Sequence, residues 1–252
     1  STMLTEKDYR FLIEDSRAFG VAFSQEFQEL ITTAGADQPF LRWSQLDSEF
    51  DISSDEAETP EPYPSIKDDI AFWLYTSGTT GFPKGAMHRH ADLGFCTDMY
   101  AATVLEMNAS DVVYSVAKLF FAYGLGNAGY FPAGTGAGVV LNPGRPVPET
   151  IAAHVTTYRP SLFFGVPTSF GQLLSSDISD DTFESVRVAI SAGEPLPGEI
   201  HRRFRERFGV EILDGLGTTE LAHIAISNRP GQSVANSSGT VVDGYEVSIR
   251  DE

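Results

Sequence analysis

Eleven consecutive residues decide the fold of this chain: Tyr75-Thr76-Ser77-Gly78-Thr79-Thr80-Gly81-Phe82-Pro83-Lys84-Gly85. The apolar run at residues 69–75 predicts a buried strand before the loop, and the apolar-periodic stretch from Gly85 onward predicts a helix after it. At such a strand-to-helix junction, backbone N–H groups at glycines can close on phosphate oxygens. The hydroxyl side chains and Lys84 add donors and a positive charge. The stretch therefore predicts a phosphate-binding loop.

Two other interpretations of this loop are weaker. A Walker A loop requires Gly-x4-Gly-Lys followed by Ser or Thr, whereas Lys84 lies between Pro83 and Gly85. A flexible linker of glycine, serine and threonine is the simplest alternative, but linkers seldom lie between a buried strand and an apolar helix. Phosphate binding is therefore the favoured interpretation.

The apolar run at residues 210–213 predicts a short strand, and it is followed by a second motif, Asp214-Gly215-Leu216-Gly217-Thr218-Thr219-Glu220. Its two glycines let the backbone approach a flat ring or a phosphate closely. Thr219 offers a hydroxyl, and Glu220 offers a hard oxygen ligand suited to Mg²⁺. A lone Gly-Thr-Thr-Glu run is weak evidence, but the two motifs together indicate a nucleotide site.

Together, the two motifs resemble the ATP-binding signatures of the acyl-adenylate-forming superfamily, which includes acyl-CoA ligases, luciferases and the adenylation domains of peptide synthetases. The resemblance implies an enzyme that uses ATP and Mg²⁺. Many members place a Tyr before the last glycine of the second motif, where it stacks on adenine, whereas this chain has Leu216. Contact with adenine at that position would be apolar packing.

The resemblance implies roles for individual residues. Thr76, Thr219 and Glu220 would be catalytic, with Glu220 as the magnesium ligand and Thr219 at the α-phosphate. The residues expected to bind ATP are Thr76, Ser77, Gly78, Thr79, Thr80, Gly81 and Lys84 at the β- and γ-phosphates, and Gly193, Glu194, Pro195, Asp214, Gly215, Leu216, Gly217, Thr218 and Thr219 around the adenosine and α-phosphate.

Two further stretches resemble landmarks of the same superfamily. The run Ser191-Ala192-Gly193-Glu194-Pro195-Leu196-Pro197 follows an apolar stretch at residues 186–190, and residues 239–247 contain Gly239 and Gly244. In the superfamily the first abuts the nucleotide and the second opens a strand-rich subdomain. Each also has an ordinary explanation, a strand-to-helix turn with a nearby proline and a hairpin turn respectively.

The stretches at residues 117–127 and 221–231 resemble the benzoate-CoA ligase branch, which activates aromatic carboxylic acids. By this resemblance, the acid pocket would be lined by Ala122, Tyr123, Ala192, Gly217, His223 and Ile224. Small residues leave room for a planar ring, Tyr123 and Ile224 can supply apolar walls, and a histidine can donate to a carboxylate. The alternatives are ordinary core packing for Phe120, Phe121 and Tyr123, and a partly buried His223 satisfied by the backbone.

The implied reaction is that of an AMP-forming carboxylic acid-CoA ligase. The acid attacks the α-phosphate of Mg·ATP to give acyl-AMP, and the thiol of CoA, a co-substrate, then displaces AMP. Two alternatives stay open: an enzyme that passes a fatty or amino acid to a carrier protein, and a non-catalytic nucleotide-binding module. The chain covers only about half of a full-length superfamily member, so we expect an internal fragment that retains little activity by itself.

Composition narrows the classes of partner. The formal net charge is −18 at pH 7, and no basic patch accompanies the aromatic residues, which argues against nucleic acid. No apolar run reaches membrane-spanning length, and the first residues do not form a signal peptide, so a cytoplasmic protein is expected. The single Cys96 is expected to be a small buried hydrophobe. His88 and His90 are expected to be helix-surface or packing residues, because no cluster of other metal ligands accompanies them.

Alternating strand and helix patterns predict an α/β fold with parallel sheets flanked by helices. The expected elements lie at residues 112–116, 123–131, 138–141, 148–158, 161–166, 168–175, 186–190 and 197–208, after a helix end and strand at residues 14–23 and an acidic, proline-containing connection at 47–69. By resemblance, residues 1–118 and 119–228 would belong to two incomplete doubly wound subdomains, and residues 229–252 would begin a β-barrel. Such folds place ligands beyond the carboxyl ends of their strands.

Overall fold

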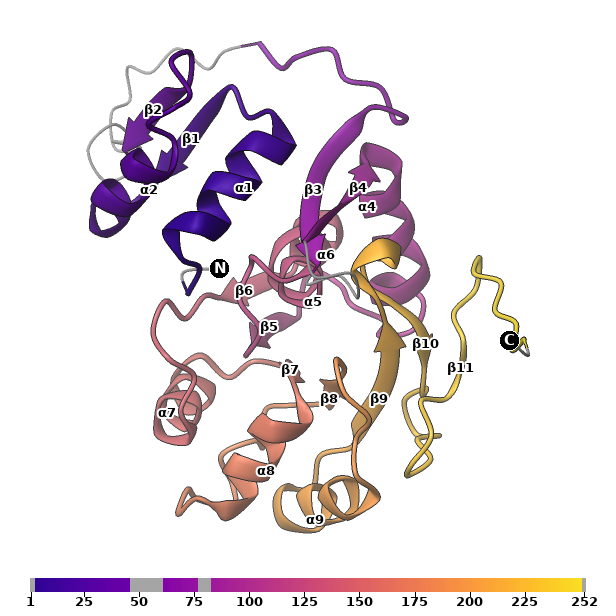
Figure 1. The fold of residues 1–252 in the computed structure, drawn as a ribbon. Helices are drawn as coiled ribbons and strands as arrows, with labels where there is room; N and C mark the ends of the chain where they lie inside the picture. The colour runs from indigo at the N-terminus through magenta and orange to yellow at the C-terminus, as the bar shows by residue number, and fades with distance from the viewer. Residues whose placement is uncertain (1–2, 46–60, 77–82, 251–252) are drawn as a thin grey trace. The chain divides into compact units, whose positions relative to one another are not determined.

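The computed structural model describes residues 3–45, 61–76 and 83–250. The chain divides into two compact units, Ser1–Ser65 and Ile66–Glu252, which are described separately (Figure 1). The subdomain boundaries that the resemblance implies, at residues 118 and 228, stay a prediction. No helix in the described ranges is long and apolar enough to cross a membrane.

The smaller unit contains two parallel strands and two α-helices. Its elements are α1 (Glu6–Ser16), β1 (Gly20–Phe23), the 3₁₀ turn η1 (Gln25–Phe27), α2 (Gln28–Ala34) and β2 (Arg42–Gln45). The Asp8 carboxylate accepts hydrogen bonds from the backbone N–H and hydroxyl of Thr5, which caps the start of α1. Ile13, Ala34 and Leu41 form a small core. The predicted helix end and strand at residues 14–23 are confirmed, whereas most of the connection at 47–69 lies outside the described residues.

The larger unit is built on a seven-stranded sheet with the order β11-β10-β9-β8-β7-β5-β6. Five strands are parallel, and β10 and β11 are antiparallel to their neighbours. The strands are β5 (Val112–Ser115), β6 (Gly138–Val140), β7 (Leu162–Gly165), β8 (Val188–Ser191), β9 (Ile212–Gly217), β10 (Ile224–Ser227) and β11 (Thr240–Val241).

Helices cover both faces of this sheet. They are α4 (His90–Cys96), the π-helical η2 (Thr97–Ala102), α5 (Ala122–Leu125), the π-helical η3 (Gly126–Tyr130), α6 (Phe131–Thr135), α7 (Pro148–Tyr158), α8 (Pro167–Ser175) and α9 (Gly198–Phe208), followed by the 3₁₀ turn η4 (Thr219–Leu221).

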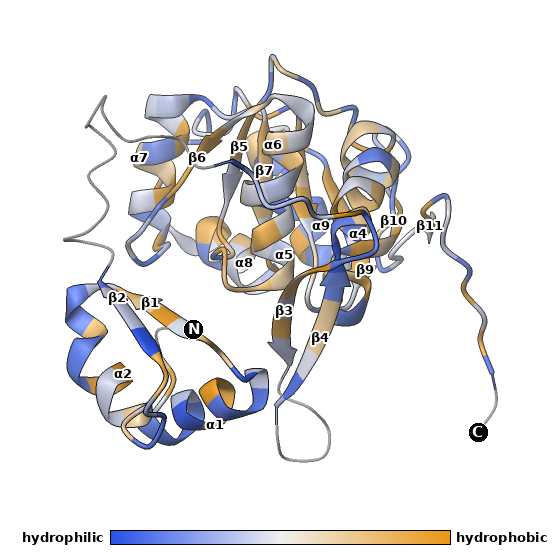
Figure 2. Cartoon of the chain, turned by 90° about the horizontal axis from the view of Figure 1, so that it is seen from above, coloured by the Kyte–Doolittle hydropathy of each residue, from blue (hydrophilic) through white to orange (hydrophobic). Residues whose placement is uncertain are grey.

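The alternation of side chains along the central strands creates two cores. Phe164 packs in one cluster with residues of α4, η2 and α6, whereas its neighbour Phe163 packs in the other with residues of α7, α8 and α9. Figure 2 shows hydrophobic residues along these central strands. Each large apolar side chain buried in this way stabilises the fold by roughly 1.5–3 kcal/mol. The predicted α/β fold with a mostly parallel sheet flanked by helices is confirmed.

The region around the phosphate loop differs from the prediction. Strand β3 (Ile70–Thr76) is present but half-exposed, and Lys84–Arg89 forms a second strand, β4, which pairs with β3 in an antiparallel hairpin. The predicted helix begins only at His90, where Asp92 caps the backbone N–H of Arg89. The helix expected from Gly85 onward was wrong because a short apolar run fits a strand as well as a helix. Strand pairing with distant residues decides between them.

Most other predicted elements are confirmed within two residues, including α7, which begins and ends as predicted. Two details differ. The strand expected at residues 210–213 begins at Ile212 and continues to Gly217, so half of the second motif is itself a strand. The helix expected at residues 123–131 is divided among α5, η3 and α6. The predicted start of a β-barrel after residue 228 stays a prediction.

Candidate functional site

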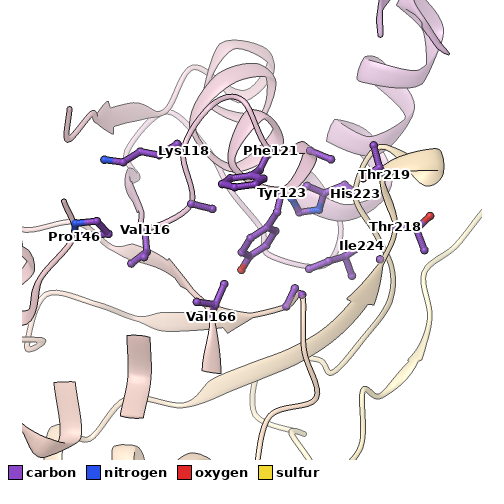
Figure 3. Close-up of a pocket in the computed structure, with 15 residues that line it drawn as sticks. Val116, Lys118, Phe121, Tyr123, Pro146, Val166, Thr218, Thr219, His223 and Ile224 are labelled. Atoms are coloured by element: carbon purple, nitrogen blue, oxygen red, sulfur yellow. The ribbon is translucent and has the colours of Figure 1, made fainter. Parts of the chain in front are cut away.

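A cavity of about 580 Å³ opens at the carboxyl ends of the parallel strands (Figure 3). Val116 follows β5, Val166 follows β7, Ala192 follows β8, and Gly217 ends β9. Parallel strands present their carboxyl ends at one edge of the sheet, which is where doubly wound folds bind ligands. The cavity is therefore the candidate functional site.

All six residues expected at the acid pocket line this cavity: Ala122, Tyr123, Ala192, Gly217, His223 and Ile224. The fold also brings Gly193, Thr218 and Thr219 of the expected ATP-binding set to the same cavity. Of that set, Glu194, Pro195, Asp214, Gly215, Leu216, Thr76 and Lys84 lie outside the cavity lining, as does the expected magnesium ligand Glu220. Ser77, Gly78, Thr79, Thr80 and Gly81 lie outside the described residues.

Six lining residues were not predicted: Val116, Ala117, Lys118, Phe121, Pro146 and Val166. The strand-end rule could have found Val116 and Val166, because each is the last residue of a predicted strand. Lys118 and Pro146 meet only through tertiary structure. The Lys118 ammonium donates to the backbone carbonyls of Asn142 and Gly144, which anchors the loop that carries Pro146. Burial lowers the pKa of Lys118.

Tyr123 projects from α5 into the cavity (Figure 3). Its hydroxyl donates to the carbonyl of Ile190 at 3.1 Å, and its ring lies 5.4 Å from the ring of His223. Burial raises the pKa of Tyr123 well above its ordinary value. Tyr123 is therefore an uncharged wall of the cavity, with its polar atom already satisfied.

A chain of three hydrogen bonds fixes the state of His223. The Ser115 hydroxyl donates to the Ala117 carbonyl at 3.0 Å, so its oxygen accepts from Asn127 Nδ2 at 3.2 Å. Asn127 Oδ1 is then the acceptor that lies 2.9 Å from His223 Nε2. His223 Nε2 therefore carries the hydrogen, and the buried Nδ1 atom has no hydrogen-bond partner in the described ranges.

Burial lowers the pKa of His223 to about 3, so the imidazole is neutral at pH 7. Its Nε2 hydrogen is donated to the Asn127 side chain, and an interaction with the Tyr123 backbone partly offsets the lowering of the pKa. The ring also packs on Phe131, with the ring centres 4.5 Å apart. The predicted donation to a bound carboxylate stays a prediction, and no Nε2 hydrogen is free for it in this arrangement.

Two buried polar side chains pair in register on β8 and β9. Ser191 pairs in register with Asp214, and neither Ser191 Oγ nor Asp214 Oδ1 has a hydrogen-bond partner among the described residues. Burial raises the pKa of Asp214, while the Ser238 hydroxyl donates to its other oxygen at 3.3 Å. Unpaired buried acceptors are costly unless a donor reaches them.

Glycine is required where β9 ends. A Cβ atom on Gly217 would lie 2.3 Å from the carbonyl oxygen of His223, which is far below contact distance. Gly193 has a φ angle of +93°, a conformation that favours glycine. The two glycines at the cavity edge therefore keep the backbone close to any ligand that binds there.

Lys84 and Thr76 form the last described pair of the β3–β4 hairpin, on either side of residues 77–82. The Glu220 side chain lies on η4 and is exposed. In the described ranges, no three His, Cys, Asp or Glu side chains group closely enough to hold a metal ion. The expected role of Glu220 as a magnesium ligand stays a prediction.

Of the remaining expected residues, Gly215 is buried on β9, and the other three are exposed. Leu216 is 54% exposed on β9, and Glu194 and Pro195 are exposed after β8. Cys96 is buried, as predicted. His90 is exposed at the start of α4, but His88 lies on β4, not on a helix, and is buried.

Comparisons with known proteins agree with this geometry. The family described as AMP-binding enzyme matches residues 1–252. The chain is 40% identical to the benzoate–CoA ligase of Thauera aromatica over 259 residues, which cover 100% of this chain and 49% of that protein. The chain thus spans about half the length of the curated relatives it matches.

Solved structures of two related enzymes share the fold of this chain over its whole length. A benzoate CoA ligase from Burkholderia xenovorans LB400 superposes with a TM-score of 0.90 at 38% identity, covering 100% of this chain and 51% of that one. The anthranilate CoA ligase AuaEII, in complex with anthranoyl-AMP, superposes with a TM-score of 0.92 at 33% identity, covering 100% and 50%.

Proposed function

Since the chain belongs to the AMP-binding enzyme family over residues 1–252, we propose that it carries the acid- and nucleotide-binding part of an AMP-forming aromatic acid–CoA ligase. One observation carries the proposal. A single cavity is lined by all six residues expected at the acid and by Gly193, Thr218 and Thr219 of the expected ATP-binding set. The benzoate– and anthranilate–CoA ligases among the similar proteins support an aromatic acid as the substrate.

The proposed acid is flat and largely apolar. The rings of Phe121 and Tyr123 and the side chains of Val166 and Ile224 supply apolar walls. His223 and Tyr123 are uncharged at pH 7, so a neutral aromatic ring meets no charge from them. The volume falls in the range of about 300–1,000 Å³ that is usual for small-molecule pockets. The carboxylate would lie toward Thr218 and Thr219, where ATP is proposed to bind.

The proposed nucleotide site surrounds the end of β9. Gly193 and Gly217 allow close approach of the adenosine. Thr219 would donate to the α-phosphate, and Lys84 and Thr76 to the β- and γ-phosphates. Mg²⁺ held by Glu220 and the phosphate oxygens would neutralise phosphate charge.

The proposed reaction has two steps. A carboxylate oxygen attacks the α-phosphorus, and the bond to pyrophosphate breaks, which gives acyl-AMP. The thiolate of CoA then attacks the acyl carbon, and AMP leaves. In the first step negative charge develops on the phosphates, and donors already fixed in position stabilise it without reorganisation. Thr219 and Lys84 are the residues of this chain proposed for that task.

The test is acid-dependent release of AMP by the full-length protein with benzoates, larger aryl acids, fatty acids and amino acids, each with and without CoA. We expect an aryl acid to give CoA-dependent turnover. Preference for an alkyl or amino acid, or turnover that needs a carrier protein in place of CoA, would reject the aromatic acid–CoA ligase. No acid-dependent release with any substrate would favour a non-catalytic nucleotide-binding protein.

A further inference from the structure

His88 makes a buried hydrogen bond between segments far apart in the sequence. Its side chain is almost fully enclosed on β4, and its Nε2 atom lies 2.8 Å from the backbone carbonyl oxygen of Thr219, 131 residues later. A carbonyl can only accept, so His88 Nε2 carries the hydrogen and donates it. The ring packs on Phe72 of β3, with ring centres 5.1 Å apart, and Nδ1 lies 3.9 Å from an Asp92 carboxylate oxygen.

This hydrogen bond joins the two segments proposed to bind phosphate. Lys84 begins β4, four residues before His88, and pairs with Thr76 at the end of β3. Thr219 and Glu220 begin η4. A bond to the Thr219 carbonyl holds the peptide between Thr219 and Glu220, so it constrains the directions in which these two side chains leave the backbone.

The η4 turn needs such restraint. Ala222, directly after it, has a φ angle of +63°, which an alanine adopts only when its surroundings enforce it. Side chains hold the neighbouring carbonyls as well: Tyr130 donates to that of Ala222 at 3.4 Å, and Tyr245 to that of Leu221 at 3.3 Å. His88 differs from both tyrosines because it belongs to the hairpin that carries Lys84.

We propose that His88 is a positioning residue that aligns Thr219 and Glu220 with Lys84, so that both phosphate-binding segments engage one nucleotide. The inference rests on the proposed use of ATP at this site. His88 touches neither the cavity nor the proposed position of the phosphates, and it acts through the Thr219 carbonyl. Without the bond, the two segments would still form, but their relative position would be less constrained.

The test compares three substitutions of His88 in the full-length protein. Gln places an amide donor at about the reach of Nε2, whereas Asn places it a bond shorter and Leu offers none. His90→Leu, on an exposed histidine two residues away, is the matched control. The measurements are the Kd of ATP by equilibrium titration, the KM values for ATP and acid, kcat, and the thermal unfolding midpoint.

We expect His88→Leu and His88→Asn to weaken ATP binding and to lower kcat/KM for ATP by roughly 10- to 100-fold, the usual consequence of losing a buried hydrogen bond to a constrained group. The KM for the acid at saturating ATP should change much less. His88→Gln should restore ATP parameters to within a few-fold, and His90→Leu should leave them unchanged. A purely structural role would instead lower the unfolding midpoint and affect acid and ATP alike.

The outcomes separate this inference from the proposed function. If the wild type binds ATP but activates no acid, the ligase is rejected, and the Kd series still decides the role of His88. If all three variants bind ATP as the wild type does, or if Gln is as impaired as Leu and Asn, the positioning role is rejected while the ligase stands. Should His88→Leu fail to fold, the comparison of Gln with Asn decides. A wild type that binds no ATP rejects both.

Discussion

The wall and the rim of the candidate site are built in opposite ways. At the wall, Tyr123 and His223 are uncharged and already hydrogen-bonded within the protein. The rim, as used here, is the pair Lys84 and Glu220, which lie outside the cavity lining and are exposed and charged. Charge is expensive to bury unless it is paired, whereas an uncharged ring needs a fixed shape around it. The contrast teaches that close packing fixes the shape of the cavity around the proposed acid. The charged side chains stay in contact with water, where they can bind phosphates and a cation.

The largest expected effect comes from removing charge at the rim. Glu220→Gln keeps the size of the side chain but removes the proposed magnesium ligand's charge, so the rate of adenylation in the full-length protein should fall by about 100-fold or more. The measurement is AMP release at saturating acid and ATP over a range of Mg²⁺ concentrations. Glu246→Gln, on another exposed carboxylate, is the control. An unchanged rate would remove Glu220 from the mechanism.

Gly217→Ala tests the close packing where wall and rim meet. The added Cβ would press on the His223 carbonyl at 2.3 Å, and backbone cannot move aside cheaply. We expect a loss of roughly 1–3 kcal/mol in the free energy of unfolding, with a matching loss of acid binding. Gly171→Ala, within helix α8, is the control. The added Cβ atom would lie 3.6 Å from Ile200 Cδ1, which is an ordinary contact distance. Equal stability of the two variants would contradict the packing argument.

His223→Ala tests the wall itself. Opening the wall should raise the KM for the acid by about tenfold and the KM for ATP by much less, since truncation removes contacts to the ring of the acid. Steady-state kinetics with each substrate varied at saturating levels of the other measures the split. Equal changes in both KM values would indicate that His223 has only a structural role.

The neutral state of His223 also predicts a pH dependence of stability. The folded-state pKa is about 3, below the ordinary value of 6.5, so the unfolded chain binds the extra proton between these values. The contribution of neutral His223 to the free energy of unfolding is fully present above about pH 6.5 and is lost as pH falls toward 3. The slope is at most about 1.4 kcal/mol per pH unit. Denaturant unfolding of wild type and His223→Leu at several pH values should show a shallower slope in the variant. Parallel slopes would contradict a neutral, buried His223.

The smallest expected effect is at Leu216. The side chain is 54% exposed on β9, so an aromatic ring has room there. Leu216→Tyr should tighten ATP binding by roughly two- to tenfold, the usual worth of an aromatic stacking contact. Equilibrium titration with ATP measures the change, and Leu216→Ile serves as an apolar control. No change with Tyr would place adenine away from Leu216.

Most of the fold was predictable because its signals are local. Proline at the first turn marks the starts of α7 and α8, and the length and periodicity of each apolar run distinguish strand from helix. Residues 84–89 failed this test because six residues are too few for periodicity to decide. Their pairing with β3, a contact across the loop, made them a strand.

The candidate site was predictable only in part. The motif residues Ala192, Gly217, His223 and Ile224 could be named, because their segments carry recognisable sequence patterns. Pro146 could not be named, because it lies on a loop that the distant Lys118 anchors by hydrogen bonds.

The sequence by itself determined the class of fold, the two nucleotide motifs and the set of residues expected at the acid, since each depends on residue types at short spacing. Only the tertiary structure decided how those residues meet. It placed the hydrogen of His223 on Nε2 through Asn127 and Ser115, and it buried His88 against the Thr219 carbonyl. Hydrogen bonds across 96 and 131 residues leave no trace in local patterns, because they depend on how the chain closes on itself.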